Sequence, residues 1–114
     1  MPQHIWQITT HEDFDLNDFI NALEDSQRAA LARFLELIQD FEDLTRAPRS
    51  WIKPLGQGLF EFRIRSSDVL LRLFFTYREG RLILLVGGYD KRRDPSEKRQ
   101  NREIAIARKR LLNA

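Results

Sequence analysis

The chain has 114 residues, no cysteine and a formal net charge of +2. This length predicts one domain over residues 1–114 with a single hydrophobic core. The absence of cysteine excludes disulfides and thiolate metal sites. No apolar run approaches the roughly 20 residues that cross a bilayer, and the N-terminus lacks the basic and apolar regions of a signal peptide. We therefore expect a cytoplasmic protein without a membrane partner.

The charge is distributed unevenly along the chain. Residues 1–45 hold ten acidic and two basic side chains, a net charge of −8, whereas residues 46–114 hold seventeen basic and seven acidic ones, a net charge of +10. Such asymmetry favours an acidic scaffold that carries a basic working surface. The alternative is a helical half and a sheet half whose solvated charges happen to differ.

The first half of the chain is predicted to be mainly helical. After a short strand over residues 4–9, apolar residues recur at the spacing of an amphipathic helix near residues 16–23. A second helix is expected from an N-cap at Ser26 to about Asp43. The short gap between the helices predicts an antiparallel helical hairpin. The apolar stripes are Leu16, Phe19, Ile20 and Leu23 in the first helix, and Leu31, Phe34, Leu35, Ile38 and Phe41 in the second.

The second half changes to the period of a β-strand. Pro54, Gly56 and Gly58 indicate a loop and turn. The following "LFEFRIR" alternates, and two nearly continuous apolar runs, 69–77 and 81–89, follow after turns. Runs of this kind are typical of strands that are covered on both faces. Short turns between them predict an antiparallel meander.

A last helix is expected after residue 94. Asp94 is a candidate N-cap, Pro95 suits the first helical position, and Glu97 completes a capping arrangement. The apolar stripe of this helix is Ile104, Ala107 and Leu111. The predicted fold class is α+β, with an N-terminal helical hairpin packed on a small antiparallel β-sheet and a C-terminal helix.

One charged residue interrupts the apolar run "VLLRLFF" at residues 69–75. Arg72 is permanently charged, and burial without a partner is costly. We expect an anionic ligand or a carboxylate to lie beside it. The structural alternative is an internal ion pair with Glu61, Asp68 or Asp90.

Several cations are predicted to gather near Arg72 on the sheet face opposite the helical hairpin. Alternation places Arg63 and Arg65 there, and "GGYDKRR" at the end of the third predicted strand adds further groups. Cations with an aromatic side chain indicate a site for the phosphate backbone of nucleic acid. The alternative is an ordinary solvated strand face. The groups that the third strand adds are Tyr89, Lys91 and Arg92.

Other chemistries find little support. His4 and His11 have no metal-ligand spacing to carboxylates, so no metal site is expected. As an acid–base pair they lie far in sequence from the basic strands. Phosphate-binding, dinucleotide-binding and serine-hydrolase motifs are absent from the sequence, and no cofactor is expected.

The segments "KPLGQGLFEFR" at 53–63 and "LLVGGYDKRR" at 84–93, with the strand arginine between them, resemble the RelE/ParE toxin superfamily. The similarity is greatest to its HigB-like, phage-derived Gp49-like branch. The resemblance implies the toxin of a type II toxin–antitoxin module. RelE-like and HigB-like members cleave mRNA, usually on the ribosome, whereas ParE-like members poison DNA gyrase.

The resemblance also implies roles for individual residues. The catalytic set would be Arg63, Arg72, Lys91 and Tyr89, and Arg65, Arg92 and Lys53 would bind RNA. Glu61 stands where some ribosome-dependent members have lysine, and the general base is unassigned. Lys91 or Tyr89 could transfer a proton if neighbouring arginines lowered its pKa.

The expected function is therefore a ribosome-dependent mRNA endonuclease that works without a metal. The alternatives are a gyrase inhibitor and a non-catalytic phage-derived binding protein. The implied partners are mRNA on the ribosome and an antitoxin, expected to be a helix-turn-helix protein. Acidic antitoxin residues would meet the basic face in the groove between the sheet and the C-terminal helix.

Overall fold

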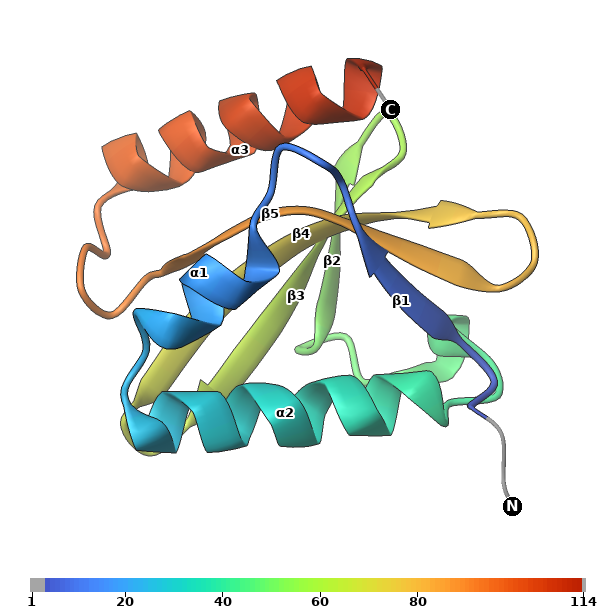
Figure 1. Cartoon of the computed structure of the whole chain (residues 1–114), viewed down its shortest axis with the longest axis horizontal. Coiled ribbons are helices and arrows are strands. Elements are labelled where there is room, and N and C mark those ends of the chain that lie inside the picture. Colours follow the sequence, from blue (N-terminus) through green and yellow to red (C-terminus); the bar gives the residue numbers. More distant parts are fainter. Residues whose placement is uncertain (1–3, 114) are drawn as a thin grey trace.

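A five-stranded sheet forms the centre of the molecule, with helices on both of its faces (Figure 1). The computed structural model describes residues 4–113. No helix within these residues is long and apolar enough to cross a membrane. In chain order the elements are β1 (Gln7–Thr10), α1 (Leu16–Asn21), α2 (Asp25–Gln39), the 3-10 turn η1 (Leu44–Arg46), β2 (Ile52–Gly56), β3 (Leu59–Ser66), β4 (Val69–Arg78), β5 (Leu82–Asp90) and α3 (Glu97–Leu112).

The strand order is β1-β5-β4-β3-β2. The predicted antiparallel meander is confirmed for β3, β4 and β5. The prediction of a purely antiparallel sheet is wrong, because β1 pairs with β5 in parallel. The chain can make this connection because α1 and α2 lie between the two strands in sequence.

β2 occupies a segment that the sequence indicated to be a loop. It pairs with β3 through a hairpin in which Gly56, Gln57 and Gly58 all have positive φ. Pro54 lies inside β2, which is tolerated because β2 is an edge strand. The glycines therefore form the hairpin turn itself. The strand before them was not predicted, because Pro54 next to these glycines indicated a loop.

α1 and α2 cover one face of the sheet with the predicted apolar stripes. Leu31, Phe34 and Ile38 of α2 are buried in the main core, and Phe34 contacts Phe62 of β3 edge to face. The boundaries of α2 differ from the prediction. The helix begins after Glu24, whose N–H donates to the Gln27 side chain at 2.8 Å, and it ends at Gln39. The capping interaction moves the start ahead of Ser26.

α3 covers part of the opposite face. Its buried Ala107 joins Leu59, Phe74, Val86 and Tyr89 in a second, smaller core. The N-cap is Ser96, whose hydroxyl accepts from the Arg99 N–H at 3.1 Å, instead of the predicted Asp94. Asp94 accepts from the Ser96 N–H at 3.1 Å and so shapes the turn before the helix.

Two arginines attach α3 to the backbone of the sheet. Arg108 donates to the carbonyl groups of Leu55 and Gly56, at 2.6 and 3.0 Å. Arg110 donates to the Val86 carbonyl at 3.0 Å. These bonds hold the C-terminal half of the helix across β2 and β5.

The Gly-Gly pair of β5 lies at a bulge where β5 packs closely against β4. The register between β4 and β5 shifts next to Phe74, which is the mark of a bulge. A Cβ on Gly88 would lie 2.7 Å from the Leu73 side chain and 3.0 Å from the Arg72 carbonyl oxygen. A side chain at this position would therefore force the Leu73 side chain and the backbone of β4 to shift beside Arg72.

Candidate functional site

A row of side chains crosses the three central strands on the face that α3 partly covers. Arg63 of β3 lies directly opposite Arg72 of β4, and Arg72 lies opposite Tyr89 of β5. In the same way, Lys53 of β2 lies opposite Glu61. Side chains that are directly opposite in a sheet lie close together. The structure therefore brings Arg63, Arg72 and Tyr89 together, as the sequence predicted.

Glu61 explains the arginine in the apolar strand. Its side chain is fully buried, and that of Arg72 is only 3% exposed. The Arg72 Nε lies 3.5 Å from Glu61 Oε1, and the Arg63 Nε donates to Glu61 Oε2 at 3.2 Å. One buried carboxylate therefore serves two guanidinium groups. The contact to Arg72 is an ion pair by distance, although neither of its two atoms has hydrogen-bond geometry.

Burial shifts the pKa of two side chains of this row, the charged Arg72 and the uncharged Tyr89. It lowers the pKa of Arg72, while the Glu61 charge acts in the opposite direction. Burial also raises the pKa of Tyr89, assisted by Glu61, and outweighs the effect of Arg72 and Arg99. The Tyr89 side chain is 2% exposed and its hydroxyl has no hydrogen-bond partner within the described chain. Tyr89 therefore keeps its proton at neutral pH.

Lys91 differs from Tyr89 in the direction of its pKa shift. Its backbone N–H donates to the Leu70 carbonyl at 2.9 Å, which continues the pairing with β4 beyond the end of β5. Partial burial lowers the pKa of its amino group, and the Arg72 charge adds to this effect. A lysine with a lowered pKa is a better proton acceptor near neutral pH than a free one.

α3 contributes groups that the sequence analysis did not assign to the site. Gln100 accepts from the Lys91 Nζ at 2.9 Å. The Arg99 guanidinium lies 5.3 Å from the centre of the Tyr89 ring and is paired with Glu103 at 2.9 Å. The i,i+4 spacing of Arg99 and Glu103 was the available signal. It does not reveal which neighbour the pair faces.

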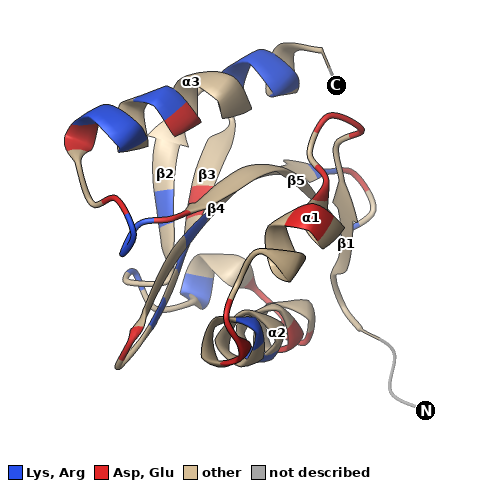
Figure 2. Ribbon diagram, turned by 60° about the vertical axis from the view of Figure 1, so that its left-hand side comes forward, with Lys and Arg blue, Asp and Glu red and all other residues tan. Residues whose placement is uncertain are grey.

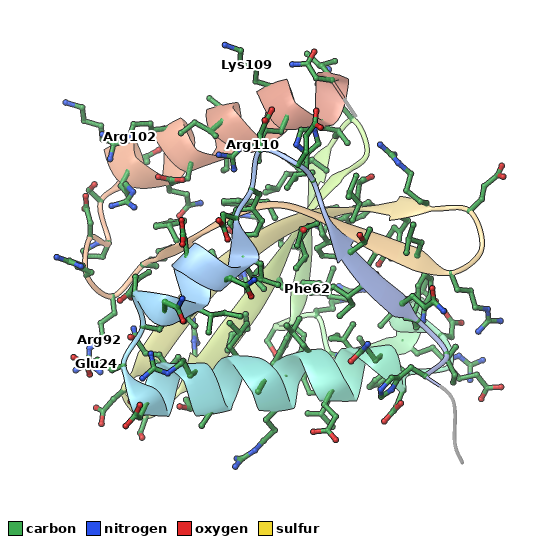
Figure 3. The ribbon with its side chains drawn as sticks, viewed as in Figure 1. Glu24, Phe62, Arg92, Arg102, Lys109 and Arg110 are labelled. Carbon is green, nitrogen blue, oxygen red and sulfur yellow. The ribbon has the colours of Figure 1, made fainter. Side chains whose placement is uncertain are left out.

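The remaining predicted site residues, Lys53, Arg65 and Arg92, lie in different surroundings. Arg65 shares the face of Arg63, and Arg65 and Lys53 are both exposed. Arg92 instead contacts Asp68 and lies near Glu24 beside the α1–α2 connection (Figure 3). We name the group formed by Lys53, Arg63, Arg65, Arg72 and Lys91 the basic cluster. Arg92 is not part of it.

The two histidines lie in other surroundings. His4 contacts Asp40 at 2.9 Å, and the His11 ring accepts from the Asp13 N–H at 3.0 Å. In residues 4–113 no three His, Asp or Glu side chains are grouped so that they could hold a metal ion.

The uneven charge of the sequence becomes an uneven charge of the molecule. Lys and Arg colour much of α3 and parts of the β2–β4 region, whereas Asp and Glu occur on α1, α2 and the loops beside them (Figure 2). The basic cluster thus belongs to a broader positive side of the structure. Such a field attracts polyanions over a distance of about one Debye length.

A mixed sheet with two N-terminal helices on one face and a C-terminal helix on the other is a RelE-like fold. A chain in the crystal structure of the archaeal RelE–RelB complex from Pyrococcus horikoshii OT3 is similar, with a TM-score of 0.51. The sequence identity is 13%, and the similarity covers 76% of this chain and 96% of that one.

Residues 18–112 match the family model described as Phage derived protein Gp49-like (DUF891). The chain therefore belongs to this phage-derived Gp49-like family, as the resemblance predicted, and its fold is RelE-like. The search of curated proteins found no match.

Proposed function

We propose that this protein is the toxin of a type II toxin–antitoxin module and that it cleaves mRNA on the ribosome. The observation that carries the proposal is the arrangement of Arg63, Arg72 and Lys91, a lysine with a lowered pKa beside two guanidinium groups. Phosphodiester cleavage needs a proton acceptor next to groups that stabilise negative charge. The RelE-like fold and the membership of the Gp49-like family support it.

The proposed reaction starts from the ribose 2′-hydroxyl. Its proton passes to the Lys91 Nζ when this amino group is deprotonated, which the lowered pKa favours, as the 2′-oxygen forms a bond to the adjacent phosphorus. Arg63 and Arg72 stabilise the negative charge that develops on the phosphoryl oxygens. The bond from phosphorus to the 5′-oxygen then breaks, and that oxygen takes a proton from the lysine or from water. The products are a 2′,3′-cyclic phosphate and a 5′-hydroxyl end.

The cations of the site differ in exposure, and we assign them different roles on this basis. The Arg63 side chain is 28% exposed and can contact a phosphate, whereas Arg72 is 3% exposed and acts from behind it. Glu61 fixes both guanidinium groups. Lys53 and Arg65 would bind the neighbouring phosphates. Tyr89 would support Arg72 and α3 as a protonated, packed side chain.

Inducible expression in a host without an antitoxin tests the proposal, with primer extension on abundant mRNAs. We expect growth arrest and new cuts inside translated codons. Arg63→Ala and Lys91→Gln should each abolish the cuts. Arg46→Ala is the matched control, because this arginine is 86% exposed and its ion pair within residues 4–113 is with Asp43, away from the basic cluster.

Each outcome has a definite meaning. Arrest with intact mRNA would refute the nuclease and favour a gyrase inhibitor. Harmless expression of folded protein would favour a binding protein without catalysis. Cuts that persist in Arg63→Ala and Lys91→Gln would show that the basic cluster is not the site.

The proposed partner is an antitoxin that carries acidic side chains. Its negative groups would neutralise the basic cluster and speed association. A helix-turn-helix protein encoded beside this chain would fit the proposal, and its co-expression should restore growth.

A further inference from the structure

A groove of about 660 Å³ lies between α2 and the C-terminal end of β3. The groove opens on the α2 side of the sheet, whereas α3 lies on the opposite side (Figure 1). Its apolar wall is formed by Ala30, Phe34 and Leu37 of α2 together with Trp51. Leu37 is 48% exposed, whereas every other leucine of residues 4–113 except Leu112 is buried or half-buried. The groove therefore offers apolar surface that the described chain leaves uncovered.

The edge of β3 beside this groove is open. β2 accompanies β3 only as far as the pair of Ile52 with Phe62, and the Arg63 N–H then donates to the Trp51 carbonyl at 2.8 Å. Within residues 4–113 no strand pairs with this edge beyond Arg63. Since alternate residues of a strand direct their backbone groups to the same side, the backbone of Arg65 faces the open edge.

The charged residues at the groove all have the same sign. Arg33 of α2 and Arg63 and Arg65 of β3 line it, and none of its lining residues is acidic. The two strand arginines lie on one face of the sheet, and the apolar wall lies on the other. A strand added at this edge would therefore meet cations with every second side chain and apolar surface with the ones between.

We propose that the open edge of β3 binds an extended segment of a partner protein in which acidic and apolar residues alternate. The segment would add a strand to the sheet, place its apolar side chains against Phe34 and Leu37, and place its carboxylates beside Arg63 and Arg65. If the proposed toxin function holds, the partner is the antitoxin. Because Arg63 also belongs to the basic cluster, the bound segment would cover a group that the RNA needs.

Titration of the ¹⁵N-labelled full chain with a short synthetic peptide of alternating glutamate and valine tests this directly by NMR. We expect shifts of the amides of Ile64, Arg65 and Ser66 and of Leu37, with a dissociation constant of about 1 mM or tighter. Leu37→Glu should weaken binding about tenfold or more. Leu112→Glu is the matched control, because that leucine is 85% exposed on α3 and should leave binding unchanged.

Two further probes separate charge and partner class. A peptide with lysine in place of glutamate should not shift these amides, and its equal binding would overturn the role of the arginines. If oligouridylate shifted the groove amides and the acidic peptide did not, the groove would be a nucleic-acid site and the proposal would be wrong. Peptide binding is measured without catalysis, so failure of the growth-arrest experiment would not refute the proposed binding edge. A chain that arrests growth but does not bind the acidic peptide would refute only this inference and not the proposed toxin function.

Discussion

The pair of Glu61 and Arg72 makes a strong prediction about stability. Arg72→Met removes a guanidinium that is 3% exposed and leaves a fully buried carboxylate with Arg63 alone. Methionine fills much of the same volume, so the main loss is the charge. The double variant Glu61→Leu/Arg72→Met removes both charges and retains apolar volume.

The magnitude follows from the burial of both partners. Removing one member of a buried ion pair costs about 3–5 kcal/mol, because the remaining charge stays desolvated. This is a large part of the 5–15 kcal/mol that is typical of the free energy of unfolding of a domain. Replacing both members by apolar residues is often close to neutral. Arg63 is 28% exposed and can be solvated without Glu61.

Urea unfolding followed by circular dichroism measures the difference, provided that the denaturant slope stays constant. We expect the double variant to recover at least about 2 kcal/mol of the loss in Arg72→Met. If Arg72→Met cost less than about 1 kcal/mol, the ion pair would not be desolvated and this explanation of the charged strand would fail. The same result explains why loss of toxicity in Arg72→Ala alone would not establish a catalytic role.

Three further predictions follow from the same side chains. Because the Glu61 charge raises the pKa of Lys91 against the effects of burial and Arg72, Glu61→Gln should lower that pKa further, as read from the lysine Nζ by NMR; an unchanged value would contradict the proximity of the two groups. Both tyrosines of the chain, Tyr77 and Tyr89, have a pKa raised above 10.0 by burial, so the folded protein should show less tyrosinate absorbance at pH 10 than the unfolded chain. Since the folded pKa values exceed the unfolded one, the contribution of the tyrosines to stability is complete below pH 10 and lost as the pH rises through the folded values; normal titration of either would refute its burial. Gly88→Ala should lower the free energy of unfolding by about 1–3 kcal/mol through overpacking against β4, whereas Gly80→Ala, in a turn with open space, is the comparison for a purely conformational effect.

The sequence predicted the parts of the fold that depend on local periodicity. The alternation of "LFEFRIR" placed Phe62 and Arg63 on opposite faces, and the stripe of α2 selected the residues that the core buries. The pairing of strands that are far apart in the sequence is not encoded in such a local pattern. β1 joins β5 in parallel across most of the chain, and nothing in its few residues specifies that neighbour.

The sequence predicted which residues belong to the candidate site better than it predicted the burial and neighbours of these residues. Arg63, Arg72 and Tyr89 share a face because strand period and turn length fix it, and the sequence carries both. The burial of Glu61 was not predictable, because the sequence indicated a loop where β2 pairs with β3 beside this residue. The pKa shifts of Tyr89 and Lys91 both come first from burial, which depends on long-range packing that no local pattern encodes.

The attachment of α3 links the catalytic candidates to the last helix of the chain. α3 buries Ala107 fully and packs Ile104 and Leu111 of the predicted stripe against the smaller core, and Arg108 and Arg110 add hydrogen bonds to backbone carbonyls. The same helix supplies the Gln100 acceptor of Lys91 and the cation over the Tyr89 ring. Any movement that lifts α3 therefore frees the lysine ammonium and hydrates the tyrosine in a single step. The protonation of the site and the docking of the helix are thermodynamically linked, so a ligand that shifts one of these equilibria also shifts the other.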